Sequence, residues 1–181
     1  GSYELRGKTL GIIGYGNMGS ALAKKLSGFD CEVIACDKYK SHYSDEYVKE
    51  VTLSELQQNS NVISLHVPLT EETNYMIDKN FIEQCAKPFY LINTARGKNV
   101  NTEDLVNALK SGKIKGACLD VLEYEDTSFE KIEKEKLPAP FHYLVDSENI
   151  ILSPHIAGWT HESYYKLSYY LAEKIIKHFK L

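Results

Sequence analysis

The feature that most constrains the fold is the glycine pattern in GIIGYGNMGSALAKKL, residues 11–26. It follows a strand-like apolar run at residues 9–13 and opens a helical period. The spacing predicts a tight turn at Gly14, a close approach of the backbone to a pyrophosphate at Gly16, and close helix–strand packing at Gly19. The helix N-terminus would offer N–H groups and a positive dipole to the phosphates. A dinucleotide site is therefore predicted, although a glycine turn without a ligand would have the same sequence.

The rest of the chain alternates between strand-like and helical patterns. Short apolar strands separated by helices indicate parallel pairing with both sheet faces covered. With right-handed crossovers they give an α/β fold with a doubly wound, Rossmann-type parallel sheet in three α/β/α layers. N-cap residues at 101–104 open one of the helices. The predicted strands are 9–13, 32–36, 62–66, 89–93, 116–120 and 149–152, and the predicted helices are 17–26, 53–58, 79–84, 102–109 and 161–181.

Two segments do not fit this rhythm simply. Residues 123–148 are charged, contain proline and separate two strands by too many residues for an ordinary connection. They are either an ordered excursion or partner-contacting arm, or a solvated loop with a short helix. The last predicted helix carries Tyr164, Tyr165, Tyr169 and Tyr170. Because a helix buries a single stripe, some of these rings must face outward or face something absent.

Composition excludes several classes of protein. The net charge of -4 and pI of about 5.9 argue against a nucleic-acid or anionic-membrane partner. No apolar run approaches the roughly 18 residues of a membrane span. The 4 cysteines lack C-x-x-C spacing, which favours reduced thiols in a cytoplasmic protein, and no metal site is expected. Residues 1–2 are interpreted as the remnant of a cleaved tag, which leaves 3–181 as one dinucleotide-binding domain.

Cofactor choice depends on the end of the second predicted strand, VIACD. Asp37 lies 18 residues beyond Gly19, where a carboxylate would accept hydrogen bonds from the adenine ribose hydroxyls. The same carboxylate would repel a 2′-phosphate, so NAD is favoured over NADP. Lys38 and Lys40 follow directly and leave NADP open as an alternative.

Three further stretches follow predicted strands: INTARGKNV, CLDVLEYED and SPHIAGW. The carboxyl ends of strands in a doubly wound sheet face one crevice, so Arg96, the acids of the second stretch and His155 could converge there. Each residue alone has a plainer explanation. Arg96 could be a surface ion-pair partner, Asp120 a cap, and His155 a histidine held in the core. Their shared edge of the sheet favours a catalytic site.

With these motifs in place, the chain resembles the NAD-binding domain of the D-isomer-specific 2-hydroxyacid dehydrogenases. The resemblance runs nearly end to end, and the wording is closest to a phosphoglycerate-dehydrogenase-like branch. The stretches that carry it are ELRGKTLGIIGYGNMGSALAKKL, VIACD, ISLHVPLTEETNYMID, INTARGKNVNTEDLVNALKSGKIKGACLDVLEYE and ILSPHIAGWT.

The resemblance implies roles for individual residues. Arg96 would bind the substrate's carboxylate and carbonyl oxygen, Glu125 would pair with the histidine, and His155 would be the catalytic acid and base. Glu123 is out of register for the pairing role, and Trp159 would lie near the substrate or simply pack. The residues expected at the cofactor, with Asp120 expected to hold the nicotinamide carboxamide, are Gly14, Gly16, Asn17, Met18, Gly19, Asp37, His66, Val67, Pro68, Asn93, Thr94, Ala95, Asp120, His155 and Ala157.

Hydride chemistry explains these residue types. Oxidation of a 2-hydroxy acid releases a hydride from C2 and a proton from the hydroxyl group. A histidine takes that proton near neutral pH because its unperturbed pKa is about 6.5. A neighbouring carboxylate favours the imidazolium and orients the ring, and a guanidinium binds a carboxylate at two points.

The resemblance also implies what else belongs to the site. The family has a second, substrate-binding domain that is missing here, so the chain should bind NAD but turn over little of its small-molecule substrate, possibly 3-phosphoglycerate. In the family the nucleotide-binding domains form a homodimer, and residues 123–148 are a candidate contact. A non-catalytic, corepressor-like dinucleotide sensor is the alternative. A formate-dehydrogenase-like enzyme is disfavoured because that group has glutamine where Glu125 stands.

Overall fold

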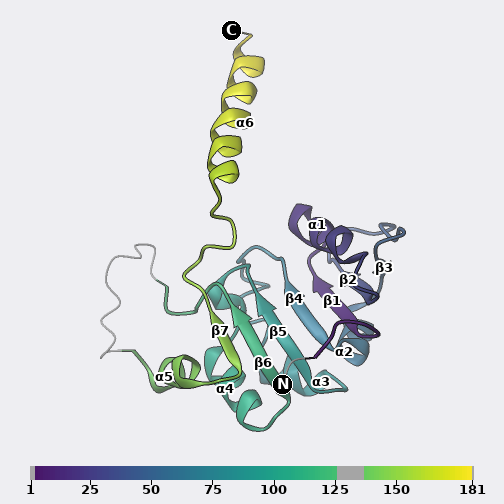
Figure 1. Ribbon diagram of the computed structural model, residues 1–181, viewed down its shortest axis with the longest axis vertical. Helices are drawn as coiled ribbons and strands as arrows, with labels where there is room; N and C mark the ends of the chain where they lie inside the picture. Colours follow the sequence, from purple (N-terminus) through teal and green to yellow (C-terminus); the bar gives the residue numbers. More distant parts are fainter. Residues whose placement is uncertain (1–2, 126–136, 181) are drawn as a thin grey trace.

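The computed structural model describes residues 3–125 and 137–180. The proposed tag remnant at residues 1–2, the middle of the 123–148 segment and the end of the last predicted helix at Leu181 lie outside the described residues. Within the described part, the chain forms a parallel sheet with helices on its faces and a long helix that extends from it (Figure 1).

Seven strands of the described residues form one sheet in the order β3-β2-β1-β4-β5-β6-β7, and every pairing is parallel. The order reverses between β1 and β4, which confirms the predicted doubly wound sheet; in sheets of this type, ligands bind outside the carboxyl ends of the strands at this switch point. The strands are β1 (Thr9–Ile13), β2 (Glu32–Cys36), β3 (Lys49–Glu50), β4 (Val62–Leu65), β5 (Phe89–Asn93), β6 (Ile114–Leu119) and β7 (Ile150–Leu152).

Polar residues that precede α2, α3 and α4 in the sequence cap the starts of these helices. Thr52 and Glu55 form a reciprocal capping box, Asp78 accepts from the Phe81 amide, and Asn101 accepts from the Asp104 amide as predicted. The described helices are α1 (Asn17–Leu26), α2 (Leu53–Asn59), α3 (Lys79–Gln84), α4 (Thr102–Lys110), α5 (Ala139–Asp146) and α6 (His161–Phe179), with a 3-10 turn at Gly97–Asn99.

The main differences between the observed and the predicted elements lie at β3 and at the start of β6, and several other ends shift by one residue. β3 was missed because its Lys-Glu pair carries no apolar signal, yet it closes the sheet edge by pairing with Ile34 and Ala35. β6 begins two residues before the predicted start of 116, at Ile114. The described end of the 123–148 segment contains the helix α5, which buries Leu144, so the short helix of one expected alternative is present.

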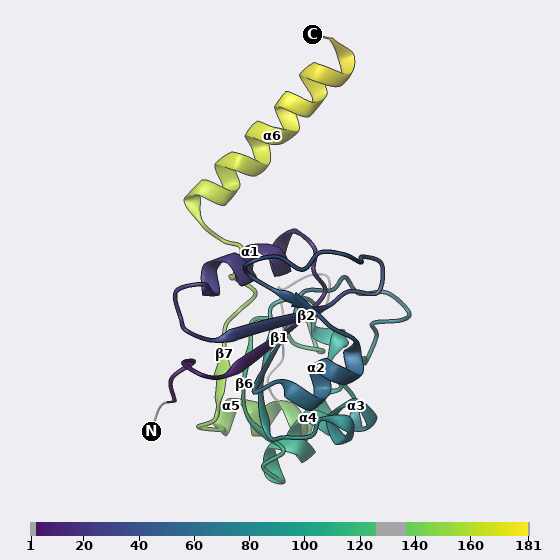
Figure 2. The same cartoon turned by 90° about the vertical axis from the view of Figure 1, so that its right-hand side faces the viewer.

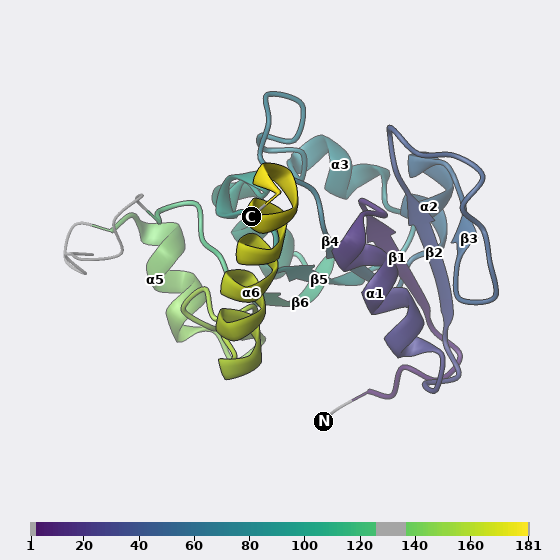
Figure 3. The same ribbon diagram turned by 90° about the horizontal axis from the view of Figure 1, so that it is seen from above.

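The layers follow from the alternation of side chains along each strand. A Cβ at Gly11 would meet Leu56 of α2, whereas the next residue, Ile12, lies against Gly19 of α1. α1 therefore covers one face of the sheet and α2 the other, as Figure 3 shows. Figure 2 shows α2, α3 and α4 together on their shared side. Side chains of β1, β4, β5 and β6 bury a continuous core under these helices.

Two apolar surfaces are left open in the described structure. α6 extends away from the sheet, and none of its described side chains is buried (Figures 1 and 2). The face of β5, β6 and β7 beside α1 carries a depression of about 830 Å³, where Ile151 is 67% exposed. The large apolar residues exposed on α6 are Tyr164, Tyr165, Leu167, Tyr169, Tyr170, Leu171, Ile175, Ile176 and Phe179.

The cysteines and the lengths of the helices can be compared with the expectations from the sequence. Its four cysteines, all in the described part, are free thiols. Burial raises the pKa of Cys36 to about 12, so this thiol stays protonated at neutral pH. Among the described helices, none combines the length and the apolar character that crossing a bilayer requires.

Close packing at Gly19 gives a first testable prediction. A Cβ there would collide with the Gly14 carbonyl oxygen, which belongs to the backbone and cannot move aside. We expect Gly19→Ala to lower the free energy of unfolding by about 1–3 kcal/mol in urea denaturation. Gly28→Ala is the control, because a Cβ there has nothing within 4 Å, and we expect a change of no more than about 0.5 kcal/mol. Equal losses in both variants would contradict the packing role.

Candidate functional site

The glycine loop between β1 and α1 is shaped to admit an anion. Gly14 has a φ of 93°, and a Cβ on it would lie 2.7 Å from the His66 carbonyl oxygen. Gly16 has nothing within 4 Å of its Cβ position, so its backbone is open to a ligand. α1 has no side-chain cap and no acidic residue in its first turn. Asn17 and Met18 are exposed at this helix start. These features fit a pyrophosphate.

Asp37 is fixed at the end of β2, next to this loop. Its Oδ2 accepts from the Tyr15 amide at 2.8 Å, and its Oδ1 accepts from the amides of Tyr39 and Lys40 at 2.9 and 3.1 Å. The Lys40 ammonium in turn donates to the Tyr15 carbonyl at 2.9 Å. The carboxylate thus stands beside the phosphate loop with its position set by three backbone N–H groups.

The segment after β4 forms the other wall of the loop. The His66 amide donates to the Ile13 carbonyl at 2.8 Å, which continues the β1–β4 ladder. Its Nε2 lies 2.9 Å from Ser64 Oγ, and burial lowers the pKa of His66. The imidazole is therefore neutral near pH 7. Val67 is half-buried and Pro68 is exposed.

Arg96 lies in a loop after β5 that two asparagines hold. Asn93 accepts from the Ala95 amide and donates to the Arg96 carbonyl, both at 3.0 Å. Asn99, which is fully buried, accepts from the Arg96 amide at 3.0 Å. The guanidinium is exposed and donates through Nη1 to the Ala95 carbonyl at 2.7 Å. Thr94 is exposed as well. Among the described residues, no carboxylate pairs with Arg96.

Asp120 organises the loop that carries the histidine. Its Oδ1 accepts from Ser153 Oγ at 2.6 Å and from the Ile156 amide at 2.9 Å, and its Oδ2 accepts from the Ala157 amide at 2.9 Å. Its backbone carbonyl accepts from the His155 amide at 2.8 Å. Burial raises the pKa of Asp120, but these hydrogen bonds and the nearby imidazole outweigh burial and bring the pKa below its usual value. Holding the carboxamide remains a prediction for Asp120.

The catalytic pair expected from the sequence is brought together. His155 Nδ1 lies 3.3 Å from Glu125 Oε2, and both side chains are partly exposed. The second oxygen of Glu125 accepts from the Leu122 amide at 2.8 Å, which fixes the carboxylate. His155 has a φ of 55°, a conformation that few non-glycine residues adopt and that often marks functional positions.

Glu123, the acid judged out of register, has a different task. It accepts from the Tyr75 hydroxyl at 2.7 Å and from the Thr102 amide at 2.9 Å. Both bonds join separate segments of the chain, so Glu123 braces the loop from which Glu125 reaches the histidine.

Sequence reasoning missed two residues that hold this site, Asn99 and Ser153. A polar residue a few positions after a predicted strand is the only signal that could have indicated them, and it is weak. Trp159 is 63% exposed, and its ring lies 6.3 Å from that of Tyr164. Within residues 3–125 and 137–180, no group of three His, Cys, Asp or Glu side chains is arranged to hold a metal ion.

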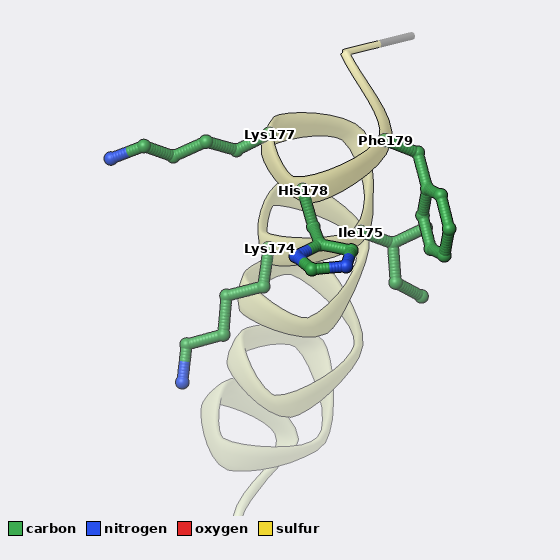
Figure 4. Close-up of a pocket in the computed structure, with 5 residues that line it drawn as sticks. All are labelled: Lys174, Ile175, Lys177, His178 and Phe179. Carbon is green, nitrogen blue, oxygen red and sulfur yellow. The ribbon is translucent and has the colours of Figure 1, made fainter.

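A hollow near the end of α6 is separate from this site. Figure 4 shows that all its lining side chains belong to a single helix: Lys174, Ile175, Lys177, His178 and Phe179. Because these side chains are exposed and come from one element, the hollow lacks the converging polar groups of a binding site.

The Asp120 interactions predict a pH-dependent stability. Asp120→Asn replaces two charged acceptors with one neutral one, so at pH 7 we expect the free energy of unfolding to fall by about 1–3 kcal/mol. The stabilisation by a carboxylate of lowered pKa is complete above its unfolded value of about 3.9 and is lost as the pH falls through the folded value. The difference between wild type and variant should therefore shrink below about pH 4 in urea denaturation. Asp146→Asn, at an exposed position of α5, is the control. An equal loss of unfolding free energy in this variant would contradict the role of Asp120.

Comparison with known proteins gives the site a family. Residues 1–157 match the family model described as D-isomer specific 2-hydroxyacid dehydrogenase, NAD binding domain. The chain is 39% identical over 176 residues to a glyoxylate reductase of Thermofilum pendens, which covers 96% of this chain and 49% of the relative. It is 43% identical over 159 residues to a D-specific alpha-keto acid dehydrogenase of Enterococcus faecalis, covering 87% of this chain and 48% of the relative.

Solved structures agree. The D-lactate dehydrogenase of Aquifex aeolicus, crystallised with NAD and lactic acid, superposes with a TM-score of 0.85 at 37% identity and covers 98% of this chain and 55% of that one. The chain spans about half the length of the curated relatives that it matches. The chain therefore belongs to the D-isomer specific 2-hydroxyacid dehydrogenases, as an NAD-binding domain of that family.

Proposed function

We propose that this chain is the nucleotide-binding half of an enzyme that interconverts a small D-2-hydroxy acid and its 2-keto acid. Similar proteins are named for glyoxylate, hydroxypyruvate, D-lactate and alpha-keto acids, which supports a small 2-keto acid as substrate. 3-Phosphohydroxypyruvate, the keto acid of 3-phosphoglycerate, is the larger alternative within the same chemistry.

The contact between Glu125 and His155 is the observation that carries this proposal. Nδ1 lies 3.3 Å from Glu125, and Nε2 is the ring atom proposed to exchange a proton with a substrate hydroxyl. The carboxylate stabilises the imidazolium that forms when Nε2 takes that proton, and it fixes the ring plane. His155 then returns the proton to the carbonyl oxygen in the reverse direction.

Arg96 is the proposed anchor of the substrate. Its guanidinium is exposed, its backbone is held by Asn93 and Asn99, and no described carboxylate neutralises it. A planar guanidinium binds a carboxylate through two parallel hydrogen bonds, which orients C2 as well as holding it. Arg96 would thus decide which face of C2 is turned to the cofactor.

The residues around the glycine loop would hold the cofactor. The open backbone at Gly16 and the uncapped start of α1 would bind the pyrophosphate, and Asp37 would accept from the ribose hydroxyls. The remaining proposed contacts come from the ends of β4, β5 and β6. When bound, NAD supplies the acceptor for the hydride that leaves C2 of the hydroxy acid.

The open apolar surfaces are proposed contacts for further protein. We propose that a substrate-binding domain of the same protein covers α6, whose exposed tyrosines, leucines and isoleucines form an extended apolar face. A second copy of the chain is the other proposed partner, which light scattering would detect. The free cysteines support a cytoplasmic location.

Cofactor binding can be tested on the chain itself. We expect it to bind NADH, seen as a change in nicotinamide fluorescence, and to turn over little 2-keto acid. Gly16→Val should lower NADH affinity at least about tenfold, because the side chain occupies the space that the pyrophosphate needs. It should leave the thermal unfolding midpoint nearly unchanged, since a Cβ at Gly16 meets nothing within 4 Å. Undiminished NADH binding by Gly16→Val would refute the pyrophosphate contact.

The catalytic role requires a full-length protein that contains this chain. We expect His155→Asn to lower kcat for 2-keto acid reduction by about 10²- to 10⁴-fold and to change the Kd for NADH less than about twofold. Asparagine is preferred to alanine because it tolerates the φ of 55° at this position. Glu125→Gln, which keeps the shape of the side chain, should reduce kcat less.

The substrate panel for this assay should include glyoxylate, pyruvate, hydroxypyruvate and 3-phosphohydroxypyruvate. A wild-type protein that binds NADH but reduces none of them would favour a dinucleotide sensor over an enzyme. Turnover that survives His155→Asn would mean that another group transfers the proton.

A further inference from the structure

Two lysines next to the ribose-binding carboxylate pose a question about cofactor choice. A 2′-phosphate on the adenine ribose is accommodated by a nearby cation, and Lys38 and Lys40 directly follow Asp37. The Lys40 ammonium donates to the carbonyl oxygen of Tyr15, a residue of the glycine loop, at 2.9 Å. Lys38 is therefore the cation whose availability decides whether this end of the site can attract a phosphate.

Lys38 is held by a glutamate from another part of the chain. Its Nζ lies 2.5 Å from Glu72 Oε1, and the other oxygen of Glu72 accepts from the Tyr39 hydroxyl at 2.6 Å. The hydrogen bond to Glu72 raises the pKa of Lys38, and the bonds from Lys38 and Tyr39 lower the pKa of Glu72. Both groups are thus charged near neutral pH, and one carboxylate fixes two consecutive side chains.

The salt bridge between Lys38 and Glu72 lies at the carboxyl ends of the strands. Lys38 and Tyr39 follow β2, whereas Glu72 lies in the segment after β4. β1 stands between those two strands, as Figure 1 shows, so the bridge spans the carboxyl end of β1, where the glycine loop begins. Because neighbouring strands lie about 4.8 Å apart, β2 and β4 end close together on either side of β1. The strand order therefore brings Lys38 and Glu72 within reach of each other. It lies at the Asp37 side of the crevice, which is the ribose side.

We propose that Glu72 determines cofactor specificity by binding Lys38, because this pairing neutralises the Lys38 ammonium and keeps it from a 2′-phosphate. This inference rests on the proposed binding of NAD at the glycine loop. It explains how a chain with two lysines after its ribose-binding acid can still prefer the cofactor without the phosphate.

The effect of removing the charge of Glu72 has a definite sign. Glutamine at position 72 keeps the length and the hydrogen-bonding capacity of the side chain but releases the ammonium electrostatically. A 2′-phosphate then meets one free cation and one carboxylate fewer. Both groups are exposed, so water and salt screen the interaction and the expected change is moderate.

The test compares the affinities of the chain for NADH and NADPH by fluorescence titration at low salt. We expect Glu72→Gln to lower the Kd for NADPH about three- to tenfold and to change the Kd for NADH less than about twofold. In the double variant Lys38→Ala/Glu72→Gln the gain for NADPH should disappear, because the released cation is gone. Glu71→Gln is the matched control: it removes the same charge from an adjacent exposed position that makes no contact with Lys38 among the described residues.

Each other outcome has one meaning. An NADPH/NADH ratio in Glu72→Gln equal to that of wild type and Glu71→Gln overturns the inference but leaves the proposed function standing. A gain that survives the loss of Lys38 also overturns it, since Lys38 would then have no part. If the wild-type chain binds neither cofactor, the proposed function fails, and this inference fails with it.

Discussion

Parallel pairing of β5, β6 and β7 is the constraint on which the candidate site depends. Their shared direction places three loops at one edge, and backbone hydrogen bonds then link the loops: Asp120 donates to Asn93, and His155 donates to Asp120. A shift of one residue in this register would turn alternate side chains to the opposite face. The histidine would then lie on a different side of the sheet from Glu125. The relative positions of the site residues thus depend on the register of these strands.

Carboxylates hold most of the loops around the site in place, and they differ in the groups from which they accept hydrogen bonds. Asp37 accepts backbone N–H groups beside the glycine loop, and Asp120 accepts the amides of the histidine loop. Glu123 joins Tyr75 to the start of α4, while Glu125 turns one oxygen to an imidazole. A carboxylate whose oxygens accept several hydrogen bonds fixes the position of the loop around it. A carboxylate next to an imidazole can instead favour the protonated form of that ring. Glu72 extends this pattern to the ribose side, where the partner is an ammonium group.

The two halves of the crevice are not equally complete. The side that faces the cofactor has a rigid turn, an uncapped helix start and fixed acids, all built from neighbouring strands. Outside this region, the Arg96 side chain is exposed and the long helix α6 has an uncovered apolar face. This asymmetry accords with a chain that spans about half the length of its relatives. The groups proposed to bind the nucleotide come from one sheet, whereas the proposed catalysis would also need walls from outside that sheet.

The sequence by itself determined the parallel fold and the glycine loop, because strand alternation, helix caps and glycine spacing are local signals. It also predicted the contact between Glu125 and His155. It missed β3 and left residues 123–148 open between an ordered excursion and a loop with a short helix, because short or charged segments are ordered by packing rather than by propensity. Only the tertiary structure decided that Glu123 braces a loop, that Asn99 and Ser153 hold the site, and that Glu72 reaches Lys38 across β1. The contacts of Glu123, Ser153 and Glu72 join residues 21, 33 and 34 positions apart, and no local pattern encodes which distant atom a polar side chain will meet.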